Sequence, residues 1–365
     1  MNIKQTISRN LLNFSGWRTT RKIVVIESDD WGSIRMPSRK VFQILSANGI
    51  PVEKSSYCKF DCLESNLDLE ILFDVLTSYK DFKGNHPVIT ANTVVANPDF
   101  DKIKESSFQE YFYEPFTETL KRYPNHDNVY NLYKEGKNKN IFFPQFHGRE
   151  HVNIDMWMNL IQTNSNFKLA FDNKMWGLSN DVLANKKNIQ ATYDSTNMKL
   201  TKESIVSGLT LFEKIFGYKS KTFIANNFIW DVSLDKILAD NGVKCLQGMK
   251  YQKLPKIGSK PNKLIRRHLG EINNYNQVYS VRNCYFEPST IKKGFKNTLE
   301  EIENCFFWKK PAIISSHRLN FIGTLSEKNR EVNIIGFRCL IESILHKWPD
   351  VEFMNSAELS VLMSK

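Results

Sequence analysis

The chain has 365 residues, a formal net charge of +11 and a hydrophobic share of 41%. This composition excludes an intrinsically disordered chain and is sufficient for a large buried core. No run approaches the roughly 18 apolar residues of a membrane span, and six scattered cysteines do not indicate a disulfide framework. Because the first 22 residues also lack an apolar run of signal-peptide length, we expect a cytoplasmic protein.

The first segment, residues 1–22, is predicted to form a short basic amphipathic helix. Its apolar residues recur at helical spacing: Ile3, Ile7, Leu11 and Phe14. No acidic residue precedes Glu27, whereas several lysines and arginines do. We expect the apolar stripe to pack on the core of the domain, and attachment to an anionic membrane surface is the alternative.

From residue 23 onward, short apolar runs alternate with segments of helical spacing, which is typical of a β/α architecture with parallel strands. Strands are expected at 23–26, 87–91, 141–146, 167–171, 222–225, 243–246, 277–281, 312–315 and 351–354. Helices are expected between them, for example at 67–79, 232–241 and 332–348. No linker or internal repeat divides the chain, so we predict one domain at 23–365.

Polar residues with metal-binding and acid–base chemistry follow three of these expected strands. Asp29 and Asp30 follow the first, the pentapeptide HGREH at 147–151 follows the strand at 141–146, and His317 follows the strand at 312–315. In a barrel of parallel strands, the residues after the carboxyl ends converge on one face. We therefore expect these three motifs to meet in one site.

The residue types in these motifs predict a metal-dependent hydrolase. His147 and His151 are four residues apart, so on a helix both imidazoles can hold Zn²⁺, with one aspartate as the third ligand. An open fourth position leaves room for a water, and the second aspartate can take its proton. His317 can then deliver a proton to the leaving group. The spacing does not decide which aspartate is the ligand.

These motifs resemble those of the polysaccharide deacetylase family, carbohydrate esterase family 4. The family motif T-F-D-D-G is matched by ESDDWG at 27–32, and H-[ST]-x-x-H is matched by HGREH at 147–151. The layout of the third motif is kept by FIANNFIWD at 223–231, and the last motif is matched by IISSH at 313–317. The resemblance spans roughly residues 22 to 365. It implies a distorted (β/α) barrel of about seven parallel strands that removes N- or O-linked acetyl groups from sugars with a divalent metal, usually zinc.

The resemblance also implies a role for each motif residue. Asp29 would be the general base and His317 the general acid, whereas the metal ligands would be Asp30, His147 and His151. The arginine that steadies the base in the family is missing from the third motif, and the candidates to replace it are Arg35, Arg149 and Arg318. The stretch at about 58–140 is longer than its counterpart in the family, so we expect an insertion that covers the site.

The expected substrate is an acetylated sugar or glycan precursor. Residues expected to contact it are Trp31, Trp176 and Trp230, whose rings would stack on a sugar, and Asn92, Asn227, Arg149 and Arg318. The segment 249–268 carries seven Lys or Arg and no acid, which indicates a solvated loop or a patch that meets phosphate groups. No nucleic-acid-binding module is recognisable.

Two other interpretations use the same residues. HGREH at 147–151 also fits the H-x-x-E-H pattern of a group of metallopeptidases, with Glu150 as the base. That interpretation leaves Asp29, Asp30 and His317 without roles. The second alternative is a non-catalytic glycan-binding protein on the deacetylase fold.

Overall fold

The computed structural model describes residues 3–178, 188–256, 258 and 261–365, and its central element is a parallel sheet. Within these residues nine strands form one sheet in the order β10-β7-β6-β5-β2-β1-β12-β11, and β13 also pairs with β1. The strands are β1 (Lys22–Trp31), β2 (Ile89–Thr93), β5 (Phe142–Phe146), β6 (Thr222–Ile224), β7 (Cys245–Gly248), β10 (Val278–Val281), β11 (Cys284–Tyr285), β12 (Ala312–His317) and β13 (Val351–Met354). Every pairing in this sheet is parallel.

The sheet bends into an almost closed barrel. β10 and β11 lie at opposite ends of the strand order, yet only residues 282 and 283 separate them along the chain. The backbone N–H of Arg282 donates to Gly248 O at the end of β7 (3.0 Å), and that of Asn283 donates to Ile313 O in β12 (3.1 Å). β10 and β11 therefore act as one broken strand between β7 and β12. The expected distorted barrel of about seven parallel strands is confirmed in this form, with β13 added beside the start of β1.

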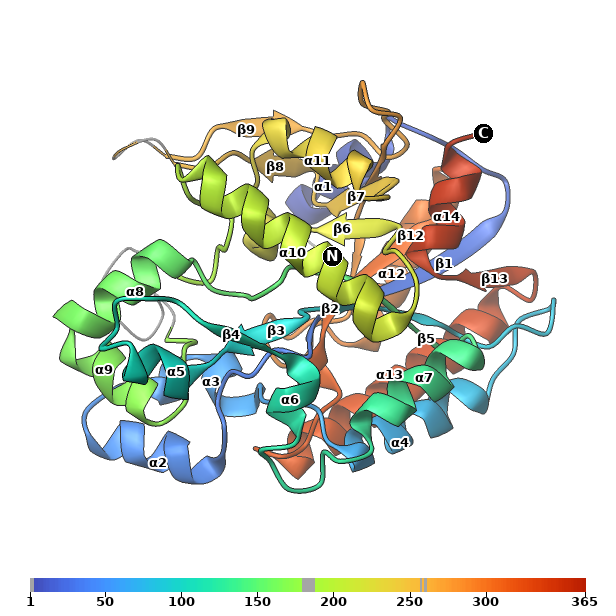
Figure 1. Cartoon of the computed structure of the whole chain (residues 1–365). Helices are drawn as coiled ribbons and strands as arrows, with labels where there is room; N and C mark the ends of the chain where they lie inside the picture. The colour runs from blue at the N-terminus through green and yellow to red at the C-terminus, as the bar shows by residue number, and fades with distance from the viewer. Residues whose placement is uncertain (1–2, 179–187, 257, 259–260) are drawn as a thin grey trace.

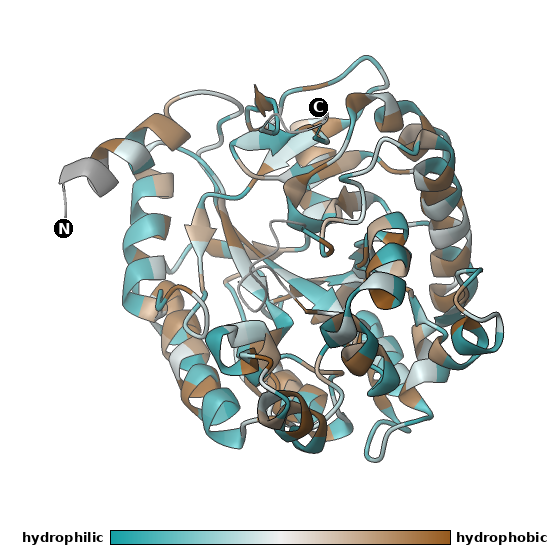
Figure 2. Cartoon of the chain, turned by 90° about the vertical axis from the view of Figure 1, so that its left-hand side faces the viewer, coloured by the Kyte–Doolittle hydropathy of each residue, from teal (hydrophilic) through white to brown (hydrophobic). Residues whose placement is uncertain are grey.

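Helices cover the outside of the barrel. Figure 1 shows α10 and α11 above the sheet and α4, α7 and α13 below it, and Figure 2 shows helices on both sides of the strands. The longer helices are α4 (Asn66–Thr77), α7 (Val129–Asn138), α8 (Ile154–Thr163), α10 (Met198–Phe216), α12 (Phe295–Phe307) and α13 (Glu327–Lys347). The shorter ones are α2 (Arg39–Ala47), α3 (Ser56–Phe60), α5 (Phe100–Glu105), α6 (Phe116–Leu120), α9 (Ser165–Asp172), α11 (Asp235–Asp240) and α14 (Ser356–Met363).

Two small hairpins lie outside the barrel. β3 (Ala96–Pro98) pairs antiparallel with β4 (Tyr113–Pro115), and β8 (Tyr251–Lys253) pairs antiparallel with β9 (Leu264–Arg266). The second hairpin lies within the basic segment 249–268. Short 3-10 helices occur at Val52–Lys54, Asn226–Phe228, Val232–Leu234 and Arg318–Asn320.

The strand expected at 167–171 is wrong, because this stretch belongs to α9. The side chain of Asn164 caps the helix by accepting bonds from the backbone N–H groups of Asn166 and Phe167. The buried residues of α9 are Phe167, Ala170 and Phe171, which is the i, i+3, i+4 spacing of one helix face. A run of five mainly apolar residues is too short to distinguish this pattern from a buried strand.

The range 58–140, expected to be an insertion over the site, is instead built into the barrel. It contains β2, which lies between β1 and β5 in the middle of the sheet. α4 and α7 from the same range contact each other, and Phe73 of α4 packs on Phe142 of β5 at 5.6 Å between ring centroids. The range is therefore long because it supplies a core strand and the helices that cover it.

The N-terminal helix α1 (Ile3–Asn13) forms as expected, but its apolar stripe does not pack on the core. Ile7, Leu11 and Phe14 are 53%, 54% and 62% exposed, and Figure 2 shows the start of α1 at the edge of the molecule. The opposite, polar face packs on α12, where Arg9 pairs with Glu300 and Glu301. The expected packing is wrong because α12 presents acidic and amide side chains to α1. Membrane attachment of the exposed stripe stays a prediction.

None of the helices among the described residues is both long and apolar enough to cross a bilayer.

A buried lysine ties the chain after α1 to the barrel, which gives a stability test. Lys310 Nζ donates to the backbone oxygens of Ser15, Gly16 and Trp17 at 2.9, 2.6 and 2.7 Å. We expect Lys310→Met to lower the free energy of unfolding by about 1.5–3 kcal/mol, measured by urea denaturation, because bonds from a charged donor are lost. Lys309→Met is the matched control, since this exposed neighbour should change stability by less than about 0.5 kcal/mol. Equal effects of the two substitutions would contradict the anchoring role.

Candidate metal centre and active site

The two adjacent aspartates lie at the carboxyl end of β1, where the strand is irregular. Asp29 pairs in register with His317 of β12, and the register between β1 and β2 shifts between Ser28 and Trp31. Asp30 has a φ of 76°, a left-handed conformation that is uncommon for a residue other than glycine. Neighbouring residues of a regular strand point to opposite faces, but this irregularity lets both carboxylates line the same pocket.

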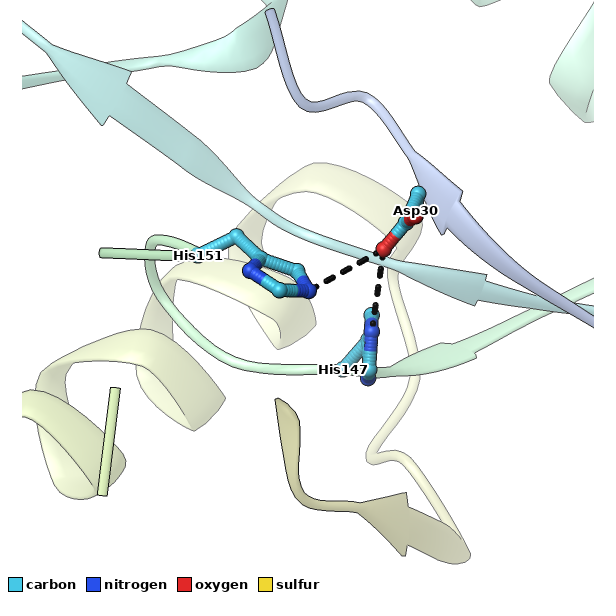
Figure 3. Close-up of side chains that lie close together, drawn as sticks. All are labelled: Asp30, His147 and His151. Carbon is cyan, nitrogen blue, oxygen red and sulfur yellow. Dashed lines mark ion pairs between the residues drawn. The ribbon is translucent and has the colours of Figure 1, made fainter. Parts of the chain in front are cut away.

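The two histidines follow β5, in a loop rather than on the expected helix. Gly148 has a φ of 119°, and the backbone N–H of His147 donates to Thr93 O of β2 (2.9 Å). The loop nevertheless brings both rings to Asp30, as Figure 3 shows. Asp30 Oδ1 lies 3.4 Å from His147 Nε2 and 3.1 Å from His151 Nε2. Both histidines therefore meet Asp30 as expected, but a loop rather than a helix brings them together.

The donor geometry of these three residues fits a divalent metal ion. One ligand atom from each lies within 4.8 Å of the others, and all three residues are buried. Ligands at 2.0–2.1 Å from a tetrahedral ion lie about 3.3 Å apart, which agrees with the two distances to Asp30 Oδ1. Asp30, His147 and His151 thus form a candidate metal site.

Neighbouring groups fix the protonation and orientation of the two imidazoles. Ile224 O lies 3.0 Å from His147 Nδ1 and accepts its proton, so Nε2 presents a lone pair to the metal position. Burial lowers the pKa of His151 to about 4 against the opposing charge of Asp30, so this ring is neutral at pH 7. A neutral imidazole is the form that binds a metal. The ring of Trp176 stacks on His151 at 5.6 Å between centroids.

Arg35, which lies between β1 and α2, contacts the metal site. Its Nη2 donates to Asp30 Oδ2 (3.1 Å), which leaves Oδ1 for an ion, and its Nε lies 2.9 Å from Asp61 Oδ2. Nη2 also lies 3.4 Å from His151 Nε2. A guanidinium and a metal ion cannot both contact His151 Nε2. Metal binding therefore requires that Arg35 give up its contact with His151 while it keeps its bond to Asp30.

Asp29, the expected base, is held by an arginine that the sequence did not indicate. Arg282 Nη1 and Nη2 donate to the two oxygens of Asp29 at 2.8 and 2.6 Å, and its Nε donates to Glu27 at 2.6 Å. Asn92 Nδ2 donates to Asp29 Oδ1 at 2.7 Å, so Asn92 orients the base rather than a sugar hydroxyl. Burial alone would raise the pKa of Asp29, but the charge and hydrogen bonds of Arg282, together with the charges of His147 and His317, lower this pKa to about 2. Asp29 is therefore ionised at neutral pH.

None of the three arginines expected in that role contacts Asp29. Arg35 pairs with Asp30, and Arg318 donates to Asp61 (2.9 Å) and Glu64 (2.8 Å) in the interior. Arg149 pairs with the neighbouring Glu150. Arg282 follows the strand predicted at 277–281, so its place after a strand end was a usable signal. It was missed because it lies outside the four motifs.

His317, the expected acid, is paired with Glu287. His317 Nδ1 lies 2.5 Å from Glu287 Oε1, and Asn320 Nδ2 donates to Glu287 Oε2 (3.0 Å). Burial would lower the pKa of His317, but the charge and hydrogen bond of Glu287, together with the charges of Asp30 and Asp29, raise this pKa to about 9. The other ring nitrogen, Nε2, lies 3.9 Å from Asp29 Oδ2. A protonated imidazole and an ionised carboxylate therefore face the same space.

The five motif residues line one pocket of about 300 Å³. The other residues in its wall are Arg35, Tyr57, Gln190, Ala225, Asn227, Phe228 and Lys253. Among the residues expected to contact substrate, Asn227 lies in this wall. Arg149 and Arg318 do not, because their guanidinium groups are paired with interior carboxylates.

The tryptophans expected to stack on a sugar are buried in the core. Trp31 packs edge-on against Phe142 (4.8 Å), and its Nε1 donates to Ser28 Oγ. Trp230 Nε1 donates to Asp235, and both Trp230 and Trp176 are fully buried. These expectations are wrong because each ring fills a space between elements. The aromatic residues of the pocket wall are Tyr57 and Phe228.

Glu150, the base in the metallopeptidase alternative, points away from the metal site. Its carboxylate accepts bonds from Arg149 Nε (2.6 Å) and Ser204 Oγ (2.8 Å). It does not line the pocket that holds His147 and His151. A carboxylate that is buried and paired in this way cannot reach a water at the metal position.

The chain was compared with known proteins. No family model and no curated protein matches it. Solved structures that it resembles include a probable polysaccharide deacetylase from Pseudomonas aeruginosa PAO1, with a TM-score of 0.44 and 8% identity over 94% of this chain and 91% of that chain. A family 4 acetyl xylan esterase from Clostridium thermocellum in complex with cobalt has a TM-score of 0.39 and 12% identity, over 93% and 91%.

Another similar structure is the 4-alpha-glucanotransferase from Thermococcus litoralis, with a TM-score of 0.44 and 10% identity. The match covers 93% of this chain and 40% of that chain, so this chain spans less than half the length of that enzyme. The class that the fold and site define is an α/β barrel with a candidate metal centre.

The metal site leads to a direct binding test. Titration of the chelator-treated protein with Zn²⁺ or Co²⁺, followed by calorimetry, is expected to show one tight site. Loss of a group that only hydrogen-bonds to a metal ligand weakens metal binding by about 10- to 100-fold. Because His151 is itself a proposed ligand, we expect His151→Ala to weaken binding by more than about 100-fold. His86→Ala is the matched control, because the His86 ring bonds to Tyr79 O and does not line the pocket. Equal affinity in both variants would contradict the proposed ligand set.

Proposed function

We propose that this protein is a metal-dependent hydrolase that removes N- or O-linked acetyl groups from a carbohydrate or glycan precursor. One observation carries the proposal. The candidate metal ligands Asp30, His147 and His151 share a pocket with an ionised carboxylate, Asp29, and a protonated imidazole, His317. Hydrolysis of an amide or ester needs a base for the water and an acid for the leaving group.

A divalent ion in this site supplies a Lewis acid for the acyl carbonyl and makes a water more acidic. Asp29 accepts the proton of the attacking water. Its carboxylate is fixed by Arg282 and Asn92, so little reorganisation accompanies the reaction. Because a carboxylate with a pKa of about 2 is a weak base, the acidity of the water must provide most of the driving force for this transfer.

His317 delivers a proton to the departing nitrogen or oxygen. Its Nδ1 is held by Glu287, so Nε2 carries the proton that faces the pocket. Nε2 and Asp29 Oδ2 are 3.9 Å apart, which is too far for a direct hydrogen bond. The two groups are nevertheless close enough to act on the same acyl group. The pKa values of about 2 and about 9 keep the base ionised and the acid protonated at pH 7.

The proposal is tested by hydrolysis of acetylated sugars with zinc-loaded protein, followed as acetate release. Asp29→Asn keeps the size of the side chain but cannot accept the proton, so we expect kcat to fall at least about 100-fold. Glu150→Gln is the control, because this carboxylate faces Arg149 and Ser204. Activity that survives Asp29→Asn and is lost in Glu150→Gln would favour the metallopeptidase. Metal binding without turnover of any acetylated sugar would favour a glycan-binding protein.

The Glu287–His317 pair predicts the alkaline limit of activity. The pKa of His317 is raised to about 9, so the acid is protonated below that pH and activity falls as the pH rises through it. Glu287→Gln removes the opposing charge, and burial then lowers the pKa of His317. We expect the alkaline limb of the kcat–pH profile to move to lower pH in this variant. A limb that stays at the wild-type pH would show that His317 is not the acid.

A further inference from the structure

We propose that the substrate of this pocket carries a negative charge, as a phosphate ester or a carboxylate on the acetylated sugar, and that Lys253 binds the charged group. The inference rests on the proposed function, because it concerns the same pocket. It assigns a substrate class that the metal site and the acid–base pair do not determine.

Lys253 belongs to the β8–β9 hairpin and is fixed beside the pocket by its backbone. Its carbonyl oxygen accepts a bond from the N–H of Trp230 (3.1 Å), and residues 229 and 253 form an isolated parallel bridge. This places the hairpin next to the stretch that carries Asn227 and Phe228 in the pocket wall. The side chain of Lys253 is exposed and lines the pocket. It forms no ion pair with any of the described acidic residues.

The carboxylates in the pocket do not neutralise Lys253. Asp29 is bound through both oxygens by Arg282, which approaches from the interior. Asp30 is bound by Arg35 and belongs to the candidate metal site. Both negative charges are therefore already matched by other cations, and the charge of Lys253 remains available to a ligand.

Arg35 provides a second, buried cationic donor in the same wall. Its side chain is 3% exposed and is packed over the ring of Tyr57, with 4.6 Å between the guanidinium carbon and the ring centroid. Nη1 of this guanidinium is buried and has no hydrogen-bond partner among the described residues. Buried polar groups in proteins are normally paired, so an unpaired donor in a pocket wall is suited to an oxygen of a ligand.

The rest of the β8–β9 hairpin carries further positive charge. Lys256, Lys263 and Arg266 are exposed, and none of them forms an ion pair with an acidic residue in the described part of the chain. Unpaired cations on one strip raise the local concentration of anions and speed their encounter. All the cations of the hairpin contribute to this long-range attraction. Lys253 is the one that lines the pocket, so it is the one that would contact the bound anion directly.

The test uses the full chain loaded with zinc and the sugars that deacetylation would release, because these cannot turn over. Binding of glucosamine 1-phosphate, 2-amino-2-deoxyglucuronate and methyl glucosaminide is measured by calorimetry. We expect at least one anionic sugar to bind about tenfold or more tightly than methyl glucosaminide, which lacks the anionic group, as a charge-assisted hydrogen bond provides. The comparison of the two anionic sugars identifies phosphate or carboxylate as the recognised group.

Lys253→Met should remove this preference, and Lys253→Arg should keep most of it. Lys263→Met is the matched control, because it removes the same charge from the same hairpin without changing the pocket wall. We expect it to change the affinity less than about twofold. Equal binding of methyl glucosaminide and both anionic sugars, or equal losses in Lys253→Met and Lys263→Met, would overturn the inference. Neither result depends on acetate release, so failure of the proposed activity is detected separately.

Discussion

The site depends on one buried guanidinium, that of Arg282. This side chain is fully buried, binds both Glu27 and Asp29 of β1, and comes from the two residues that join β10 to β11. The same two residues connect the last edges of the barrel. Removing one partner from a buried ion pair typically costs about 3–5 kcal/mol because a charge is left unmatched. Closure of the barrel and ionisation of the base are therefore maintained by the same interaction.

A second layer of buried charges supports the metal side of the pocket. Asp61 forms ion pairs with both Arg35 and Arg318, and Arg318 also donates to Glu64. Arg35 in turn holds Asp30. This network connects the start of the range 58–140 and the residue after His317 to the ligand face. Of the arginines expected at Asp29 or at the substrate, Arg35 lines the pocket and pairs with Asp30, whereas Arg318 pairs with Asp61 and Glu64 behind it.

Asp29 and His317 lie in the same pocket but have partners of opposite charge. This difference sets their protonation states. An arginine adjoins Asp29 and lowers its pKa, whereas a carboxylate adjoins His317 and raises its pKa. Each partner stabilises the charged form that its neighbour needs for the proposed reaction. A general base and a general acid can coexist at neutral pH because their partners have opposite signs.

The sequence by itself determined the alternation of strands and helices and the places where Asp29, Asp30, the histidine pair and His317 follow strand ends. These features are local, since burial pattern and strand ends are encoded in neighbouring residues. It did not determine that 167–171 is helical or that the strand expected at 87–91 lies between β1 and β5 in the barrel sheet. Only the tertiary structure decided that Arg282 holds Asp29, that Glu287 pairs with His317 and that Lys253 lines the pocket. Those contacts join segments far apart in the chain, so their geometry exists only once the barrel closes.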